Sequence, residues 1–321
     1  MIKISVIIPC YNLGQYLQGC LDGILQQNID DVEYIFINDG STDDTLQRLT
    51  EFCKNRSNCK LINQLNAGVS AARNRAMECA RGEYIYLLDG DDILTEDAVA
   101  SMIAAVKDST CDAVLSEVTI LKDGIEKRVH LPIVDGTYSP KQIYEEVRIF
   151  PLMPQLLYKT EIIRNQNLKF DTQLKYGEVY DFTIRFFCFA KHIKVVSQCF
   201  FKYVMRSESA THAPNYKKDL TILDTLRKYN RVGVQFYEIP SFKLTAFKMI
   251  MSFTYNKYVK LRLKDKEAID NIQRLLEDST LRDLTKEIMQ LSSAPLKDRF
   301  LALYVYITGL SGYKFLTKLR L

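Results

Sequence analysis

Residues 86–94 read YLLDGDDIL, and three carboxylates, Asp89, Asp91 and Asp92, follow directly on the apolar run. Such carboxylates repel one another, and burying them without a cation would cost several kcal/mol for each charge. Gly90 separates the first two and has no side chain, which leaves room for the close approach of a ligand. Oxygen ligands of this kind favour Mg²⁺ or Mn²⁺, and such an ion usually bridges to phosphates. The alternative is a surface turn whose carboxylates cap the helix starting near Thr95.

Apolar strands and amphipathic helices alternate around this stretch. Strands are expected at 4–11, 33–39, 59–65 and 83–89. Three helices are expected. The first covers 15–27, the second follows a cap at Ser41 or Thr42, and the third covers 69–80. This alternation predicts an α/β fold with a parallel sheet and helices on its faces. Because ligands bind outside the carboxyl ends of such strands, a site is expected at the edge where the polar residues gather.

From residue 112 onward the sequence predicts fewer and less sharply bounded elements. This part is expected to contain a hairpin over 112–134 that turns at 122–124, a turn and a helix over 150–171, a helix over 176–191, and mostly amphipathic helix over 217–321 with breaks at Pro240 and Pro295.

The charges are unevenly distributed along the 321 residues. Residues 1–112 hold 9 Lys and Arg against 17 Asp and Glu, a balance of −8, and the rest holds 34 against 22, a balance of +12. An acidic part with a site and a basic remainder indicate two roles. The eight cysteines lack CxxC spacing and there are three histidines, which argues against zinc. Free thiols without a signal peptide predict a cytoplasmic protein.

Five motifs point to one family. Neither a Walker A run nor GxGxxG is present, so a P-loop enzyme and an ordinary dinucleotide binder are excluded. The stretches SVIIPCYN, INDGSTDDT, NAGVSAARNRA, YLLDGDD and YGEVYDF occur in the order and spacing of family 2 glycosyltransferases of the bacterial polysaccharide type. The chain resembles this family from about Lys3 to about Thr211. The resemblance implies a GT-A fold, with a mostly parallel central sheet flanked by helices and a helical C-terminal extension.

The resemblance also implies how the chain is divided. It predicts a catalytic domain at 1–212, made of a nucleotide-binding half at 1–112 and an acceptor-side half at 113–212. A basic helical region at 213–321 follows.

A donor site is implied in the same way. Its nucleotide-sugar-binding residues would be Pro9, Tyr11, Asp39, Gly68, Arg73, Asp89 and Arg206, and its metal ligands Asp91, Asp89 and Asp92. Asp39 would accept a hydrogen bond from the base or ribose, or simply cap the following helix. Arg73 would hold the nucleotide, or form an ordinary helix salt bridge. Mn²⁺ or Mg²⁺ would stabilise the charge that develops on the departing diphosphate.

The catalytic base is where the sequence departs from the family pattern. Members usually have Glu-Asp, with the Asp as base, but Val179 occupies that position here. Glu178 is the nearest carboxylate and is the preferred base, and Asp181 lies one helical turn further on. A base elsewhere and an impaired enzyme are the remaining alternatives.

The expected function is inverting transfer of a sugar from a nucleotide-diphosphate sugar, of the UDP type, to a glycan or lipid-linked saccharide acceptor. A sugar nucleotidyltransferase is one alternative, but PCYNLGQ lacks the basic residues that such an enzyme would carry after its first strand. A nucleotide-sugar-binding, non-catalytic subunit is the other, and Val179 permits it.

The C-terminal region has its own expected partner. Residues 213–321 hold 20 Lys and Arg against 11 Asp and Glu, and the final segment mixes apolar side chains with Arg299, Lys314, Lys318 and Arg320. The simple interpretation is a helical layer with solvated basic residues. The functional one is a helix on anionic lipid, which would place a cytoplasmic protein peripherally on the inner face of the membrane. Nucleic acid is not expected, because no recognition motif is present.

Overall fold

The computed structural model describes residues 2–27, 30–108, 110–147, 155–174, 177–205, 266–292 and 294–319, together with short helical pieces at 243–244, 246–247 and 250–251. The chain forms two compact units, one of Met1–Gln173 with Glu178–Ser209, the other of Leu174–Gly177 with Ala210–Leu321. The functional division of the chain expected from the sequence stays a prediction.

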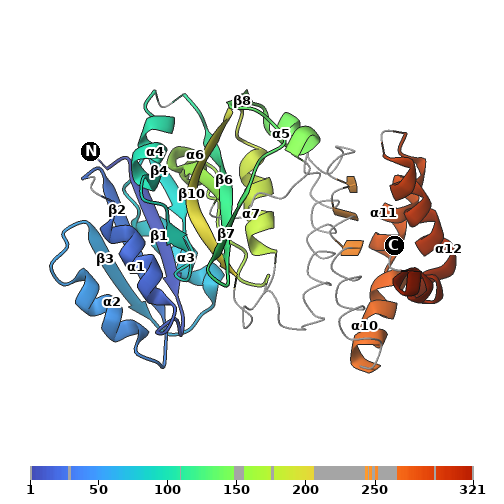
Figure 1. The fold of residues 1–321 in the computed structure, drawn as a ribbon, viewed down its shortest axis with the longest axis horizontal. Helices are drawn as coiled ribbons and strands as arrows, with labels where there is room; N and C mark the ends of the chain where they lie inside the picture. Colours follow the sequence, from blue (N-terminus) through green and yellow to red (C-terminus); the bar gives the residue numbers. More distant parts are fainter. Residues whose placement is uncertain are drawn as a thin grey trace. The chain divides into compact units, whose positions relative to one another are not determined.

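The first half of the larger unit is the parallel sheet that the alternation predicted (Figure 1). Its strands are β1 (Ile4–Cys10), β2 (Val32–Asp39), β3 (Cys59–Gln64) and β4 (Tyr84–Leu87), in the spatial order β3-β2-β1-β4 and all parallel. The connecting helices are α1 (Leu17–Leu25), α2 (Thr45–Cys53) and α3 (Val69–Cys79). The expected strands and helices are therefore confirmed within a few residues at their ends. The cap expected at Ser41 or Thr42 is wrong, because α2 begins at Thr45 after Asp44, and Ser41 and Thr42 bond to Asn12 instead.

The second half continues the same sheet with mixed strand directions. Its strands are β5 (Ile93–Leu94), β6 (Ala113–Lys122), β7 (Ile125–Val129), β8 (Gly136–Tyr138), β9 (Leu156–Lys159) and β10 (Ile193–Met205). The hairpin β6–β7 is confirmed, and Asp123 and Gly124 make its turn with φ of 51° and 76°. β10 runs parallel to β6, whereas β9 is antiparallel to both of its neighbours, β4 and β6. Because of β9 the sheet is parallel in its first half only.

The sequence did not predict β9. It is four residues long, its first three residues are buried, and α6 (Thr160–Asn165) follows it at once. A strand this short that is buried on both faces has no alternation to reveal it.

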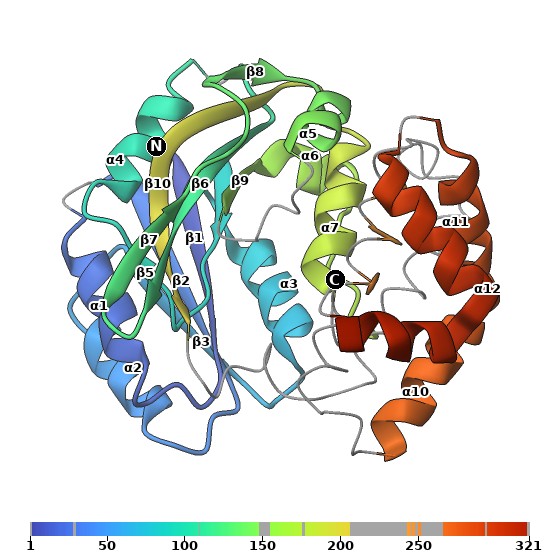
Figure 2. The same ribbon diagram turned by 45° about the vertical axis from the view of Figure 1, so that its right-hand side comes forward.

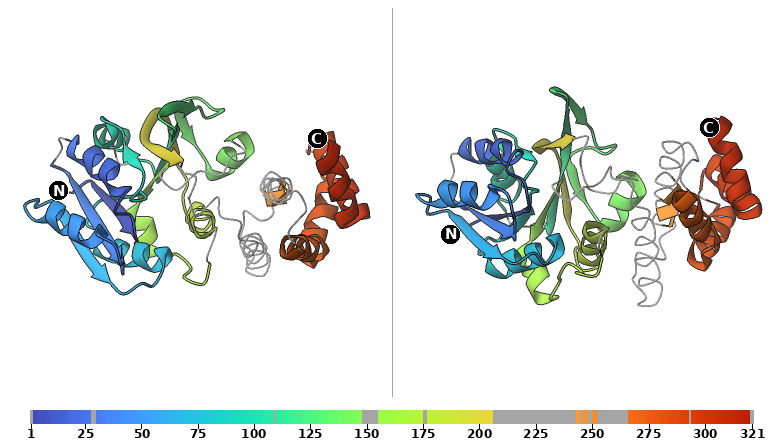
Figure 3. Two further views of the ribbon diagram at one scale, coloured as in Figure 1. Left: turned by 60° about the horizontal axis from the view of Figure 1, so that its bottom comes forward. Right: turned by 90° about the horizontal axis from the view of Figure 1, so that it is seen from below.

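Helices cover both faces of the sheet. The view from below shows the sheet between two layers (Figure 3), and the turned view shows α3 beside α7 (Glu178–Phe187) on one face (Figure 2). The other face packs on α1, α2 and α4 (Ala98–Ala105), whose apolar residues share one core with the strands. Near α7 the core is aromatic: Phe182 stacks on Phe170 with ring centroids 4.3 Å apart, and Tyr158 packs edge-on against Phe182 at 5.5 Å. Among the residues described for this unit, the remaining helix is α5 (Pro140–Val147).

The second unit is helical, as expected for a C-terminal extension. Its long described helices are α10 (Lys266–Glu277), α11 (Ser279–Gln290) and α12 (Leu296–Leu319). Asp278 caps α11 by accepting from the amide of Thr280 at 2.9 Å, and Pro295 immediately precedes α12, as the sequence predicted. Within the described residues, no helix has both the length and the apolar character needed to cross a membrane.

Candidate functional site

The turn after β3 is built on Asp39, the last residue of β2. Its carboxylate accepts from the amides of Ala67 and Gly68, each at 2.9 Å, and from Gln64 Nε2 at 2.8 Å. Asp39 is buried, so its first task is to hold the turn that leads into α3. Gly68 adopts φ of 88° there, and no atom lies within 4 Å of the position where a side chain would start. The Gly68 backbone is thus open on one side, as close approach of a ligand requires.

The loop after β1 is fixed by the motif after β2. Asn12 donates its amide to Ser41 Oγ at 3.0 Å, and its Oδ1 accepts from the amide of Thr42 at 2.8 Å. The Gly14 amide donates to Asp43 Oδ2 at 2.9 Å. These bonds hold the loop while Tyr11 remains half exposed. Tyr11 therefore offers an aromatic surface, whereas Pro9 is buried in β1.

Arg73 links the ends of two other elements. Its side chain is 4% exposed; Nη2 donates to Asp89 Oδ1 at 2.9 Å and Nη1 to Glu178 Oε1 at 3.0 Å. Burial alone would lower the pKa of Arg73, but the charges of Asp89 and Glu178 outweigh it and raise the pKa above its ordinary value. The guanidinium therefore stays charged, and it brings together residues 89 and 178, which are far apart in the sequence.

The three carboxylates of the acidic turn have different environments. Asp92 is 2% exposed, and its Oδ1 accepts from the amide of Val204 in β10 at 3.0 Å. Burial, with the nearby charge of Asp89, raises the pKa of Asp92 well above its ordinary value. Asp89 and Asp91 are partly exposed instead. Among the described residues, no group of three or more His, Cys, Asp or Glu is arranged to hold a metal ion, and the metal ligands expected from the sequence stay a prediction.

Gly90 is needed for a different reason than the sequence suggested. A side chain at this position would meet Cys10 Sγ and Leu13 Cδ1, each at 2.8 Å, and the carbonyl oxygen of Pro9 at 3.2 Å. The space beside Gly90 is thus filled by the end of β1 rather than left for a ligand. This packing brings Asp89 and Asp91 to the first strand.

Asp181 lies inside the protein. It is fully buried, and its Oδ2 accepts from Arg185 Nε at 2.9 Å one helical turn along α7. Arg185 also donates to the carbonyl of Lys169 at 2.7 Å. Asp181 therefore holds Arg185, which ties α7 to the preceding loop, and this buried position argues against a role of Asp181 as the base.

The site thus gathers most, but not all, of the residues proposed from the sequence. Asp39, Gly68, Arg73, Asp89, Asp91 and Glu178 lie at the carboxyl-end edge of the first four strands or are bonded to residues there. Arg206 lies outside the described residues. One residue was missed: the ring of Phe170 lies 5.3 Å below the Arg73 guanidinium. Nothing in the local sequence marks Phe170, because it reaches Arg73 only through the fold.

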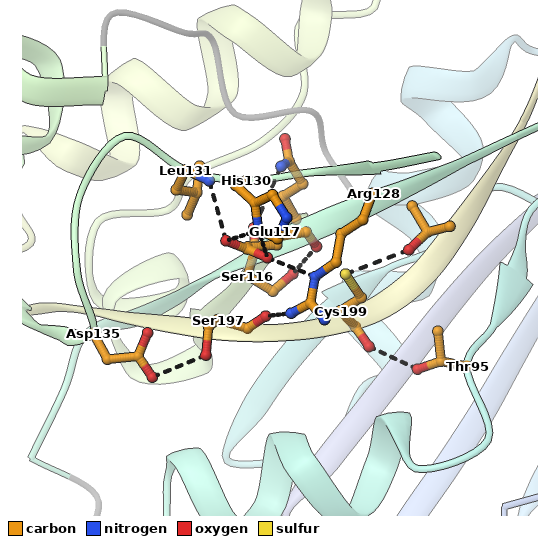
Figure 4. Close-up of polar contacts among 11 residues, drawn as sticks. Thr95, Ser116, Glu117, Arg128, His130, Leu131, Asp135, Ser197 and Cys199 are labelled. Atoms are coloured by element: carbon orange, nitrogen blue, oxygen red, sulfur yellow. Dashed lines mark hydrogen bonds and ion pairs between the residues drawn. The ribbon is translucent and has the colours of Figure 1, made fainter. Parts of the chain in front are cut away.

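A second polar cluster lies around β6, β7 and β10, and the sequence did not predict it (Figure 4). Buried Glu117 accepts from Arg128 Nε at 2.7 Å and from the amide of Leu131 at 3.2 Å, and His130 Nδ1 lies 3.0 Å from its Oε2. Arg128 also donates to the carbonyl of Ser197 at the bulge of β10. Glu117 is thus satisfied by its neighbours, and the cluster holds the hairpin to β10.

The comparisons with known proteins agree on one family. The family model of glycosyl transferase family 2 matches residues 5–168. The chain is 26% identical over 243 residues to the glycosyltransferase EpsJ of Bacillus subtilis, and this alignment covers 73% of this chain and 69% of EpsJ. It is 31% identical over 250 residues to chondroitin synthase of Escherichia coli, and this alignment covers 70% of this chain but only 36% of that enzyme.

A solved structure supports the fold. Residues 1–349 of Staphylococcus aureus TarS, crystallised in complex with UDP, superimpose with a TM-score of 0.73 and cover 98% of this chain and 90% of that one. At 20% identity this likeness establishes the fold alone, and it confirms the expected GT-A architecture with its helical extension.

Asp181→Asn tests whether this buried carboxylate is structural. Loss of its charge leaves Arg185 with a weaker partner, so the free energy of unfolding should fall by about 1–3 kcal/mol while turnover of the folded protein is unchanged. Urea unfolding and steady-state rates measure the two effects. Glu78→Gln, in an exposed pair with Lys169, is the control and should change stability by less than about 1 kcal/mol. A stable Asp181→Asn protein that has lost the chemical step would make Asp181 the base instead.

Proposed function

The chain belongs to glycosyl transferase family 2, and from this premise we propose that it moves a sugar from a UDP-sugar to a glycan or lipid-linked saccharide, with inversion at the sugar. The protein is a glycosyltransferase; the donor, the acceptor and the stereochemistry are what is proposed. The UDP-type donor is supported by the TarS structures, which were solved in complex with UDP and with UDP-GlcNAc. The acceptor class is supported by relatives named for poly(ribitol phosphate) and chondroitin.

One observation carries the proposal. The guanidinium of Arg73 lies 2.9 Å from the carboxylate of Asp89 and 3.0 Å from that of Glu178. The proposed donor-binding carboxylate and the proposed base are therefore separated by a single cation. The two carboxylates therefore lie near one another at the same edge of the sheet, as groups that act on one substrate must.

The donor would bind along the edge where the parallel strands end. Tyr11 offers a half-exposed ring for the nucleoside, and Gly68 offers an open backbone beside Asp39. Asp39 already accepts three hydrogen bonds, so contact with a base or ribose would use its remaining capacity. Arg206 stays a proposed diphosphate contact from the sequence alone.

A divalent metal, Mn²⁺ or Mg²⁺, fits two of the three acidic residues. Mg²⁺ is usually bound through one or two carboxylates and substrate phosphates, so Asp89 and Asp91 suffice without a third protein ligand. Asp92 fits poorly, because it is buried and turned to Val204. When bound, the metal would stabilise negative charge on the leaving diphosphate.

Glu178 is the proposed base. Its side chain is 14% exposed at the start of α7, whereas Asp181 has no exposed surface and is paired with Arg185. Glu178 would take the proton of the acceptor hydroxyl as the new glycosidic bond forms. Val179 next to it supplies no such group.

The helical unit is proposed to meet an anionic membrane through α12. Leu296, Phe300, Leu303 and Ile307 are 67%, 66%, 41% and 70% exposed, and their spacing puts them on one stripe of the helix. The basic charge of residues 213–321 complements anionic lipid and favours this partner over a neutral surface. Part of the Arg299 side chain is held against α11, because its Nε donates to the carbonyl of Met289 at 2.9 Å.

Glu178→Gln tests the base. The amide keeps the shape of the side chain but cannot take a proton, so kcat should fall by about a hundredfold or more while the KM for the donor changes little. Release of UDP from a UDP-sugar in the presence of acceptor measures both constants. Unchanged kcat in a folded protein would move the base outside α7.

Asp91→Ala tests the metal. Because Asp91 would bring the metal to the diphosphate, calorimetry should show UDP affinity falling at least about tenfold on adding chelator to the native protein. The variant should bind UDP weakly with or without Mn²⁺ and should lack turnover. Asp92→Asn is the matched control and should keep the Mn²⁺ effect. Equal UDP affinity of the native protein with and without Mn²⁺ would contradict the metal.

Phe300→Glu with Ile307→Glu tests the membrane surface. Both residues are exposed, so the fold should persist while sedimentation with vesicles containing anionic lipid drops several-fold, because apolar burial is lost and acidic charge is added. Ile125→Glu, at an equally exposed residue of the β6–β7 hairpin, is the control and should sediment normally. If the sedimented fraction depends neither on lipid charge nor on the substitutions, α12 is not the membrane surface.

A further inference from the structure

The surroundings of Arg73 are unusual for a residue that would hold a nucleotide. Arg73 is 3% exposed and lies over the ring of Phe170, with its two terminal nitrogens bonded to Asp89 and Glu178. Within the described part of the chain, its Nε has no hydrogen-bond partner. Almost none of the guanidinium surface is left for a ligand, so direct contact with the donor is not its main task.

Each carboxylate gives only one oxygen to this bridge. Arg73 is bonded to Oδ1 of Asp89 and to Oε1 of Glu178. Among the described residues no hydrogen bond is made by Oδ2 of Asp89 or Oε2 of Glu178, and the two side chains are 39% and 14% exposed. One oxygen of each group is thus fixed by the cation, and the other is left for substrate.

The three groups come from three different elements. Arg73 lies in α3, Asp89 follows β4, and Glu178 begins α7. A glutamate side chain has three rotatable bonds, and among the described residues Arg73 is the sole hydrogen-bonding partner of the Glu178 side chain. The orientation of the Glu178 carboxylate therefore depends on Arg73.

We propose that Arg73 is the positioning residue of the transfer reaction, which holds Glu178 with its second oxygen toward the acceptor and ties that placement to Asp89 on the donor side. This role rests on the proposed function, because it acts through Glu178 as base. It differs from the nucleotide contact expected from the sequence, since it predicts an effect on the chemical step and not on donor binding.

The physical basis is the geometry that proton transfer demands. A base acts within about 2.6–3.2 Å of the proton it removes, and a misplacement of about 1 Å can cost a hundredfold in rate. A lysine can keep the charge, but it is a point charge without the fork that reaches two carboxylates at once. Arg73→Lys should therefore leave the charge near the site and lose the orientation of Glu178.

A double-mutant cycle between Arg73→Lys and Glu178→Gln tests this role. Arg73→Lys alone should lower kcat at least about tenfold with the donor KM nearly unchanged. In the Glu178→Gln background the same change should have little further effect, because the group it positions no longer acts as a base. Arg185→Lys, in the other arginine–carboxylate pair of α7, is the control and should lower stability without lowering kcat.

The results distinguish failure of the proposed base, Glu178, from failure of the proposed role of Arg73. If Glu178→Gln retains turnover, the proposed base is wrong and the role of Arg73 falls with it. If Glu178→Gln is impaired but the two losses multiply, or if Arg73→Lys raises the donor KM and spares kcat, only the role of Arg73 is overturned.

A second variant covers the case in which Arg73→Lys does not fold. Phe170→Leu keeps Arg73 and removes the ring beneath its guanidinium. It should lower kcat modestly, and only while Glu178 is present. An equal loss in the Glu178→Gln background would overturn the role of Arg73.

Discussion

The parallel register of the first four strands is the constraint on which the site depends. β1 pairs with β2 from Ile4 opposite Val32 to Cys10 opposite Asn38, and β2 pairs with β3 up to Asp39 opposite Gln64. Parallel strands in this register end at one edge, so the polar segments that follow them must meet there. Every contact described at the donor edge, from the Asp39 turn to Asp89, depends on this alignment. A register shift of one residue would turn Asp39 to the opposite face of the sheet.

This constraint explains why so much of the fold can be predicted from one sequence. The apolar runs of the first four strands, the amphipathic helices between them and the turn at Asp123–Gly124 are local signals, and the structure confirms each. The antiparallel strand β9 is different. Its four residues acquire a strand identity from their neighbours β4 and β6, and those neighbours are not adjacent to it in sequence.

The same distinction applies to the site. Sequence order indicated which residues gather, but not which way their side chains point. Asp92 is adjacent to Asp91 and chemically identical to it, yet it turns inward to Val204 because β10 lies beside it in the sheet. The space beside Gly90 is filled by Cys10 and Leu13, and Asp181 is buried against Arg185. The bridge through Arg73 is likewise invisible in sequence, because its partners lie 16 and 105 positions away.

The bond between Asp92 and Val204 joins the acidic turn to the last strand of the larger unit. Val204 is the penultimate residue of β10, and that unit ends at Ser209. The acidic turn therefore holds the end of β10 in place. The third carboxylate of the motif thus links the proposed donor edge to the end of β10 through one hydrogen bond.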